Sequence, residues 1–166
     1  MNAQHSEDDV LADIADAVFL LHREIKLQTA GAPGVVHLRP SEGMIMRLVD
    51  HNAGLTVTEL AELSGLQRTN VSSALTCLEN KGLVEKRPDP LDGREVRVHA
   101  TPLAHENIRS LRQQWASLLR TALGSASGGA DALSFLSRLA GGLVEARLDD
   151  RHPLAGGLLL QGPPQS

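Results

Sequence analysis

The side chains best suited to chemistry lie on one face of a helix predicted from about residue 68 to 81. Apolar residues at the i, i+3, i+4 and i+7 spacing mark its buried side: Val71, Ala74, Leu75 and Leu78. The opposite face carries one arginine and short hydroxyl or amide side chains: Arg68, Thr69, Asn70, Ser72, Ser73, Thr76 and Asn80. Long acidic side chains are absent from that face. Its composition therefore suits contacts with phosphates and base edges in a DNA major groove, which is about 12 Å wide.

A short helix and a tight turn are predicted immediately before this face. Thr56 and Glu59 form the Thr-x-x-Glu pattern of a capping box, which marks a helix start. Ala61, then Gly65 and then Val71 have the spacing of a helix-turn-helix, in which the glycine takes the left-handed backbone of the turn. Other pairs of packed helices can show this spacing by chance, so the prediction also depends on the residues beyond the second helix.

Two short strands joined by a turn-rich loop are predicted after Gly82, which ends the helix. Residues 83–87 and 95–100 have strand character, and the second segment alternates apolar and polar side chains. The loop between them, PDPLDGR at 88–94, is rich in turn-forming residues. A ribbon of this kind forms the wing of a winged helix-turn-helix. Its candidate DNA contacts are three arginines: Arg87, Arg94 and Arg97.

The segment that contains the helix end and the ribbon resembles the multiple-antibiotic-resistance regulator (MarR) family of bacterial transcription factors. The resemblance is carried by LENKGLVEKR at 78–87 and DPLDGR at 89–94. It implies that Arg94 enters the minor groove from the tip of the wing and that Asp92 braces the loop. Many members have a second arginine where this chain has Gly93. Many also have Leu-Thr-x-x-Gly where this chain reads ATPLA at 100–104, but Thr101 and Pro102 still suit the start of a helix.

Three apolar stripes lie outside the winged segment, at both ends of the chain. Their members are Leu11, Ile14, Val18, Leu21 and Ile25; Ile108, Leu111, Trp115, Leu118 and Ala122; and Leu133, Leu136, Ala140 and Leu143. Each stripe alone is also typical of an amphipathic helix that packs within one subunit. Three stripes outside the winged segment favour an intertwined homodimer.

The expected fold is mainly α with a small β-wing, in one MarR-type domain over residues 1–166. A winged helix-turn-helix lobe is expected at about 40–100, a helical dimerisation region at about 8–30 and 102–148, and a tail without an assigned role at 149–166. The expected function is that of a sequence-specific regulator of transcription, a repressor, which binds double-stranded DNA. A two-fold dimer presents its two helices to successive major grooves, so the operator should be a pseudo-palindromic inverted repeat.

Composition excludes several other classes. The 166 residues contain no apolar run of about 18 residues, and the acidic start MNAQHSEDDV differs from a basic export signal, so a cytoplasmic protein without a membrane span is expected. The single cysteine, Cys77, cannot form an intrachain disulfide, which fits a reducing compartment. Two phenylalanines, one tryptophan and no tyrosine argue against stacking on single-stranded nucleic acid.

The net charge of −4 is unevenly distributed along the chain. Residues 68–97 hold six basic and five acidic side chains, whereas the rest holds ten basic and fifteen acidic ones. Charge effects reach only about 8 Å at physiological salt, so the local balance matters more than the total. A local balance this small predicts few phosphate contacts and a shallow dependence of binding on salt.

A small-molecule effector is implied by the resemblance, and an aromatic acid is one candidate. Its site is expected where the first, second and fifth helices meet the winged lobe. The residues predicted to line it are His22, His37, Arg47 and His51, for each of which a surface or helix-end role is the alternative.

Neither catalysis nor metal binding is predicted. His105 and Glu106 begin like a zinc-hydrolase motif, but Arg109 stands where the second histidine would be. No nucleophile with a base is visible, so we expect no enzyme activity, metal or cofactor. The alternative function is a winged-helix module for protein contacts, which should show an apolar patch in place of the hydroxyl-lined face.

Overall fold

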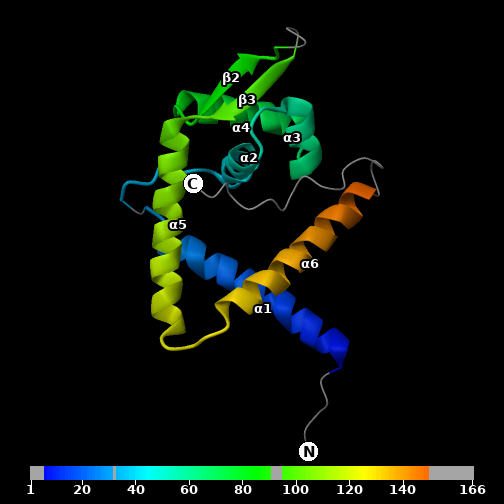
Figure 1. The fold of residues 1–166 in the computed structure, drawn as a ribbon, viewed down its shortest axis with the longest axis vertical. Helices are drawn as coiled ribbons and strands as arrows, with labels where there is room; N and C mark the ends of the chain where they lie inside the picture. Colours follow the sequence, from blue (N-terminus) through cyan, green and yellow to red (C-terminus); the bar gives the residue numbers. More distant parts are fainter. Residues whose placement is uncertain (1–5, 32, 91–94, 150–166) are drawn as a thin grey trace, which may run out of the picture.

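The protein is a set of helices around one small antiparallel sheet (Figure 1). The structure, a computed structural model, describes residues 6–31, 33–90 and 95–149. In chain order its elements are α1 Glu7–Gln28, α2 Pro40–His51, β1 Leu55–Thr56, α3 Val57–Ser64, α4 Arg68–Asn80, β2 Val84–Pro88, β3 Val96–Ala100, α5 Pro102–Leu123 and α6 Gly129–Asp149. The mainly helical fold with a small β-wing that the sequence predicts is confirmed.

The helix-turn-helix forms where the capping pattern and the glycine predict it. The Thr56 hydroxyl accepts from the Glu59 N–H at 3.2 Å, and the Glu59 carboxylate accepts from the Thr56 N–H at 2.7 Å. These two bonds satisfy orphan amides at the start of α3. Gly65 ends α3 with φ of 71°, the left-handed conformation that glycine takes at low cost. Gly82 does the same after α4, with φ of 69°.

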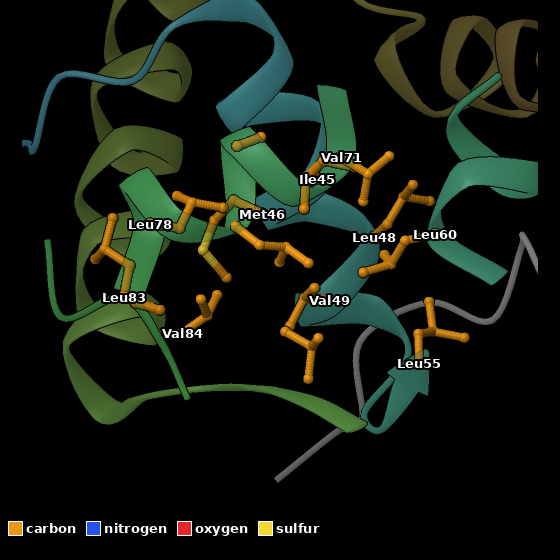
Figure 2. Packing of buried hydrophobic residues seen from close by; sticks show 14 residues of the cluster. Ile45, Met46, Leu48, Val49, Leu55, Leu60, Val71, Leu78, Leu83 and Val84 are labelled. Atoms are coloured by element: carbon orange, nitrogen blue, oxygen red, sulfur yellow. The ribbon is translucent and has the colours of Figure 1, made fainter. Parts of the chain in front are cut away.

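The hydrophobic core lies within the winged lobe, which we define as α2 through β3. Figure 2 shows the packing of Ile45, Met46 and Leu60 with the side chains of α4. The apolar stripe predicted for α4 is buried against α2 and α3, and Leu75 has none of its surface exposed. The burial of one face of α4 forces its other face outward.

The sheet has the strand order β1-β3-β2, with both pairs antiparallel. The two wing strands run from the pair Val84 and Ala100 to the pair Pro88 and Val96. Each starts one residue later than the sequence predicts. The third strand, β1, was not predicted, because two residues are too short for an alternating pattern and pair only through a distant partner, β3.

The long helices α1, α5 and α6 lie largely outside the core. Figure 1 shows α5 running from the sheet to the far end of the molecule and α6 returning to the lobe. No residue of α1 is buried, and Leu133 and Leu143 of α6 are 68% and 74% exposed. The three apolar stripes thus lie on helices, but within one chain the stripes of α1 and α6 are left largely exposed to solvent. No described helix combines the length and the apolar character needed to span a membrane.

Candidate nucleic-acid interface

The outward face of α4 carries every residue that the sequence places there. Arg68, Thr69, Asn70, Ser72, Ser73, Thr76 and Asn80 are all exposed. The Ser73 hydroxyl donates to the Thr69 carbonyl at 2.9 Å, and the Thr76 hydroxyl donates to the Ser72 carbonyl at 3.0 Å. With its hydrogen directed at the helix backbone, each hydroxyl oxygen offers acceptor lone pairs to the surface. Cytosine and adenine present amino donors in the major groove that such an acceptor can contact.

The surface of α4 also argues against an apolar docking patch. Large exposed hydrophobic side chains occur in the described part of the chain on α1, α2, β3, α5 and α6, but none of them belongs to α4. A winged-helix module that used α4 for protein contacts should expose such side chains there. The face of α4 is therefore polar along its whole length.

Arg68 brings a positive charge to the start of α4. Its Nη2 donates to the Thr58 hydroxyl of α3 at 2.6 Å. Within residues 6–31, 33–90 and 95–149 it has no ion-pair partner. The hydrogen bond holds the side chain across the two helices of the motif, and the charge stays uncompensated by a carboxylate in this part of the chain.

The cations of the wing strands are paired within the chain. Arg87 contacts Glu85, and Lys86 donates to Glu79 of α4 at 2.8 Å. Arg97 contacts the buried carboxylate of Asp89, and its Nη1 donates to the Gly54 carbonyl at 2.7 Å. The hydrogen bond with Asp89 raises the pKa of the Arg97 guanidinium above its ordinary value, and the negative charges around it add to this effect.

These pairs give Arg97 a structural contact that the sequence does not reveal. It joins the loop before β1 to the end of β2, so it braces the root of the wing. Its role and that of Arg87 as DNA contacts stay predictions. The residues expected at the wing tip, Asp92, Gly93 and Arg94, lie outside the described residues.

An ion pair between a partly exposed lysine and a buried glutamate fixes the other end of α4. Lys81, the residue after α4, donates to Glu42 of α2 at 2.5 Å and to the His37 carbonyl at 2.9 Å. Glu42 is only 2% exposed and also accepts from the Arg39 N–H at 2.9 Å. Burial raises the pKa of Glu42, but these hydrogen bonds and the charges of Lys81 and Arg39 outweigh burial and hold the pKa below its ordinary value.

We expect this pair to make the fold sensitive to acid. Unfolded Glu42 takes up its proton near the ordinary pKa of 4.5, whereas folded Glu42 does so at lower pH. The stabilisation is present above 4.5 and is lost as the pH falls toward the folded pKa. Urea titrations between neutral pH and pH values below 4.5 should show a smaller acid loss in Glu42→Gln than in wild type. Glu106→Gln, at an exposed glutamate, is the control; an equal acid loss in wild type and Glu42→Gln contradicts the account.

The four residues predicted to line an effector site come from α1, from the segment before α2 and from α2 itself. His22 is exposed on α1, and His37 is exposed in the segment before α2. His51 ends α2, where its Nδ1 lies 2.7 Å from the Arg47 carbonyl oxygen. Arg47 alone makes a contact with α5: its Cζ lies 4.8 Å from the centre of the Trp115 ring. Ligand contact by these four residues stays a prediction.

Two residues near Arg47 were not predicted as site residues. Burial lowers the pKa of the Arg47 guanidinium, and the positive charge of Arg112 on α5 lowers it further. Trp115 was identified only as part of an apolar stripe. The spacing of Arg112 and Trp115 could have indicated this cluster, because residues three apart lie on one side of a helix.

A wide, open pocket of about 440 Å³ lies at this cluster, between the end of α2 and the stretch of α5 from His105 to Ala116. Its lining is Asp50, His105, Ile108, Arg109, Arg112, Gln113 and Ala116. None of the four predicted effector residues lines it. His105 contacts Asp50 at 2.9 Å across the two helices. In the described part of the chain, no three His, Cys, Asp or Glu residues lie close enough together to hold a metal ion.

Comparison with known proteins agrees with this architecture. Residues 38–95 match the model of the MarR family. Among curated proteins, no relative matches the chain.

Three solved structures share the fold over more than four-fifths of this chain. The transcriptional repressor CouR, bound to a 23-mer DNA duplex, is similar with a TM-score of 0.62 and 23% identity over 83% of this chain and 92% of that one. The regulator SlyA has a TM-score of 0.58 and 20% identity over 86% and 99%. BldR from Sulfolobus Solfataricus has a TM-score of 0.61 and 17% identity over 82% and 99%. The resemblance drawn from the sequence is confirmed: residues 38–95, which include most of the winged lobe, match the MarR family model, and the three solved structures share the fold.

Proposed function

We propose that this protein is a cytoplasmic transcriptional repressor that binds double-stranded DNA as a homodimer. The observation that carries the proposal is the outward face of α4, where hydroxyl, amide and guanidinium groups stand opposite a fully buried stripe. Such a helix can enter a major groove and contact base edges, as the second helix of a helix-turn-helix does. The fold likeness to CouR, whose structure contains a DNA duplex, supports the same use of this surface.

The homodimer is supported by the apolar side chains that one chain leaves uncovered. Phe19 of α1 and Leu143 of α6 are each more than two-thirds exposed, at 71% and 74%. A soluble monomer rarely exposes large apolar surface over long helices, whereas a dimer covers it. Two copies joined through α1, α5 and α6 would carry two winged lobes, so the operator is an inverted repeat.

The charges around α4 support a modest electrostatic contribution to binding. Arg87 and Arg97 face carboxylates within the chain, whereas Arg68 has none in the described part. We assign sequence-tolerant phosphate contacts to Arg68 and minor-groove contact to Arg94, whose placement lies outside the described residues. Each phosphate contact contributes about −0.9 to the slope of log affinity against log salt, so the slope should be shallow.

Release by a small anion, such as an aromatic acid, completes the proposal. Arg47 and Arg112 bring positive charge to the α2–α5 side of the molecule, and Trp115 offers a flat apolar surface there.

The proposal is tested by selecting sequences from a random double-stranded DNA library with the purified protein. We expect an inverted repeat with its half-sites about one helical turn apart. Footprinting on the selected duplex, with and without aromatic acids, then examines effector release. Retention of all sequences with equal affinity would overturn the proposal.

We predict that the α4 hydroxyls discriminate between bases. Ser73→Ala and Thr76→Ala should each reduce the preference for the selected duplex over random DNA by about 1–3 kcal/mol, because a base contact is lost. Thermal unfolding should change little, since both side chains are exposed. The matched control is Thr121→Ala, which removes an exposed threonine of α5 with the same hydroxyl-to-carbonyl bond, at 3.1 Å. Full discrimination in the Ser73→Ala, Thr76→Ala double variant would contradict this role.

A further inference from the structure

The end of α6 contacts the helix-turn-helix through Arg147. Its Nη1 donates to the Glu62 carbonyl at 3.0 Å, and its Nη2 donates to the Leu63 carbonyl at 2.7 Å. Both carbonyls belong to the last turn of α3, where helical N–H partners run out. A guanidinium there also lies at the negative end of the helix dipole. Arg147 therefore caps α3 from a helix that lies far away in the sequence.

The turn glycine makes room for this contact. A Cβ atom at Gly65 would lie 3.1 Å from Nη1 of Arg147, which is tighter than most contacts of real Cβ atoms. Gly65 thus permits both the left-handed turn and the approach of the guanidinium. The neighbouring Leu148 is buried, at 6% exposed, although most of α6 is not. The hydrogen bonds of Arg147 attach the last turn of α6 to α3, toward which α6 returns in Figure 1.

The contact joins two parts of the molecule with different roles. The rest of α6 exposes apolar side chains that the proposed dimer covers, and the turn after α3 leads directly into α4. A bidentate guanidinium fixes direction as well as distance, because its donors are held in one plane. Arg147 thus adds a second connection between the lobe and the long helices, beside α5, which follows β3 directly in the chain.

We propose that Arg147 is a positioning residue, which holds α4 at a fixed orientation to α6 and thereby sets the half-site spacing that the dimer binds. The part that concerns DNA rests on the proposed function. The orientation itself is a property of the protein alone. One measurement therefore tests the orientation of α4 relative to α6, and a second tests its effect on the half-site spacing.

The first measurement uses no DNA. Spin labels are attached at Asn80→Cys on α4 and Arg138→Cys on α6 in a Cys77→Ser background, and labelled chains are diluted with unlabelled protein so that only intrachain distances count. Wild type should give one narrow distance distribution. Arg147→Met keeps the aliphatic stem but removes all donors, so the distribution should broaden.

Two further variants complete this measurement. Arg147→Lys keeps the charge and the fold but cannot reach both carbonyls in one plane, so an intermediate width is expected. Arg120→Met, at an exposed arginine of α5, should match wild type. If Arg147→Met does not fold, Arg147→Lys decides the matter. A folded variant of Arg147 with the wild-type distribution overturns the proposal.

The second measurement compares duplexes selected by the wild type. If only about a tenth of Arg147→Met dimers hold both lobes in the competent orientation, affinity for the full repeat falls about tenfold. Binding to a single half-site should stay unchanged, and insertion of one base pair between half-sites should cost the variant less than wild type. An equal loss on the single half-site would overturn the proposal, because the effect would then lie within one lobe. Failure of the wild type to bind any duplex would contradict the proposed function, and the distance measurement would still decide the role of Arg147.

Discussion

Leu143→Glu should convert the protein into a monomer that no longer binds its operator. Leu143 is 74% exposed in one chain, so a glutamate there costs an isolated chain little. In a dimer that covers α6, the same glutamate is a buried carboxylate without a partner, which costs several kcal/mol. A monomer offers one α4 to one half-site, so binding to the full repeat fails although α4 is unchanged. Light scattering and DNA titration measure the two effects.

The control for this variant is Ser134→Glu, which adds the same charge on the side of α6 that faces away from Leu143. It should remain dimeric and should bind DNA like wild type. The melting temperature of the wild type should also rise with protein concentration, because association of two chains stabilises the folded state by mass action. A Leu143→Glu protein that stays dimeric, or a wild type that is monomeric yet protects both half-sites, would contradict the proposed dimer.

Leu75→Ala should lower the free energy of unfolding by roughly 2–5 kcal/mol, which is the range for removing a fully buried leucine from a tight core. Leu75 has no exposed surface and lies on the side of α4 that packs within the winged lobe. The effect should therefore appear without DNA, in urea unfolding followed by circular dichroism. Ser72→Ala, one turn away on the exposed face of α4, serves as the control and should change stability little. A loss below about 1 kcal/mol in Leu75→Ala would mean that this core has relaxed around the cavity, contrary to its close packing.

The parts of the fold that the sequence predicts are those with local physical causes. Thr56 and Glu59 satisfy each other's backbone amides three residues apart, and Gly65 adopts a conformation that other residues avoid. The buried stripe of α4, which includes Leu75, follows from helical spacing alone. The exposed face opposite it was predictable for the same reason.

The features that the sequence does not reveal depend on residues far apart in the chain. Strand β1 exists only because Leu55 pairs with Val98. Arg97 looked like a DNA contact by its place in the wing, whereas its contacts with Asp89 and Gly54 become visible only in three dimensions. The contact of Arg147 with α3 has no sequence signal either, because its acceptors are backbone carbonyls that any residue supplies.

The central claim, that two copies of this chain read an inverted repeat, is tested most directly by sedimentation of the protein with a selected duplex. Chains and duplex are mixed at a series of ratios near physiological salt, beside a scrambled duplex of the same length and composition. The account predicts one complex that contains two chains per duplex and that the scrambled duplex does not form at the same concentrations. A complex with one chain per duplex, or equal binding to both duplexes, would contradict it.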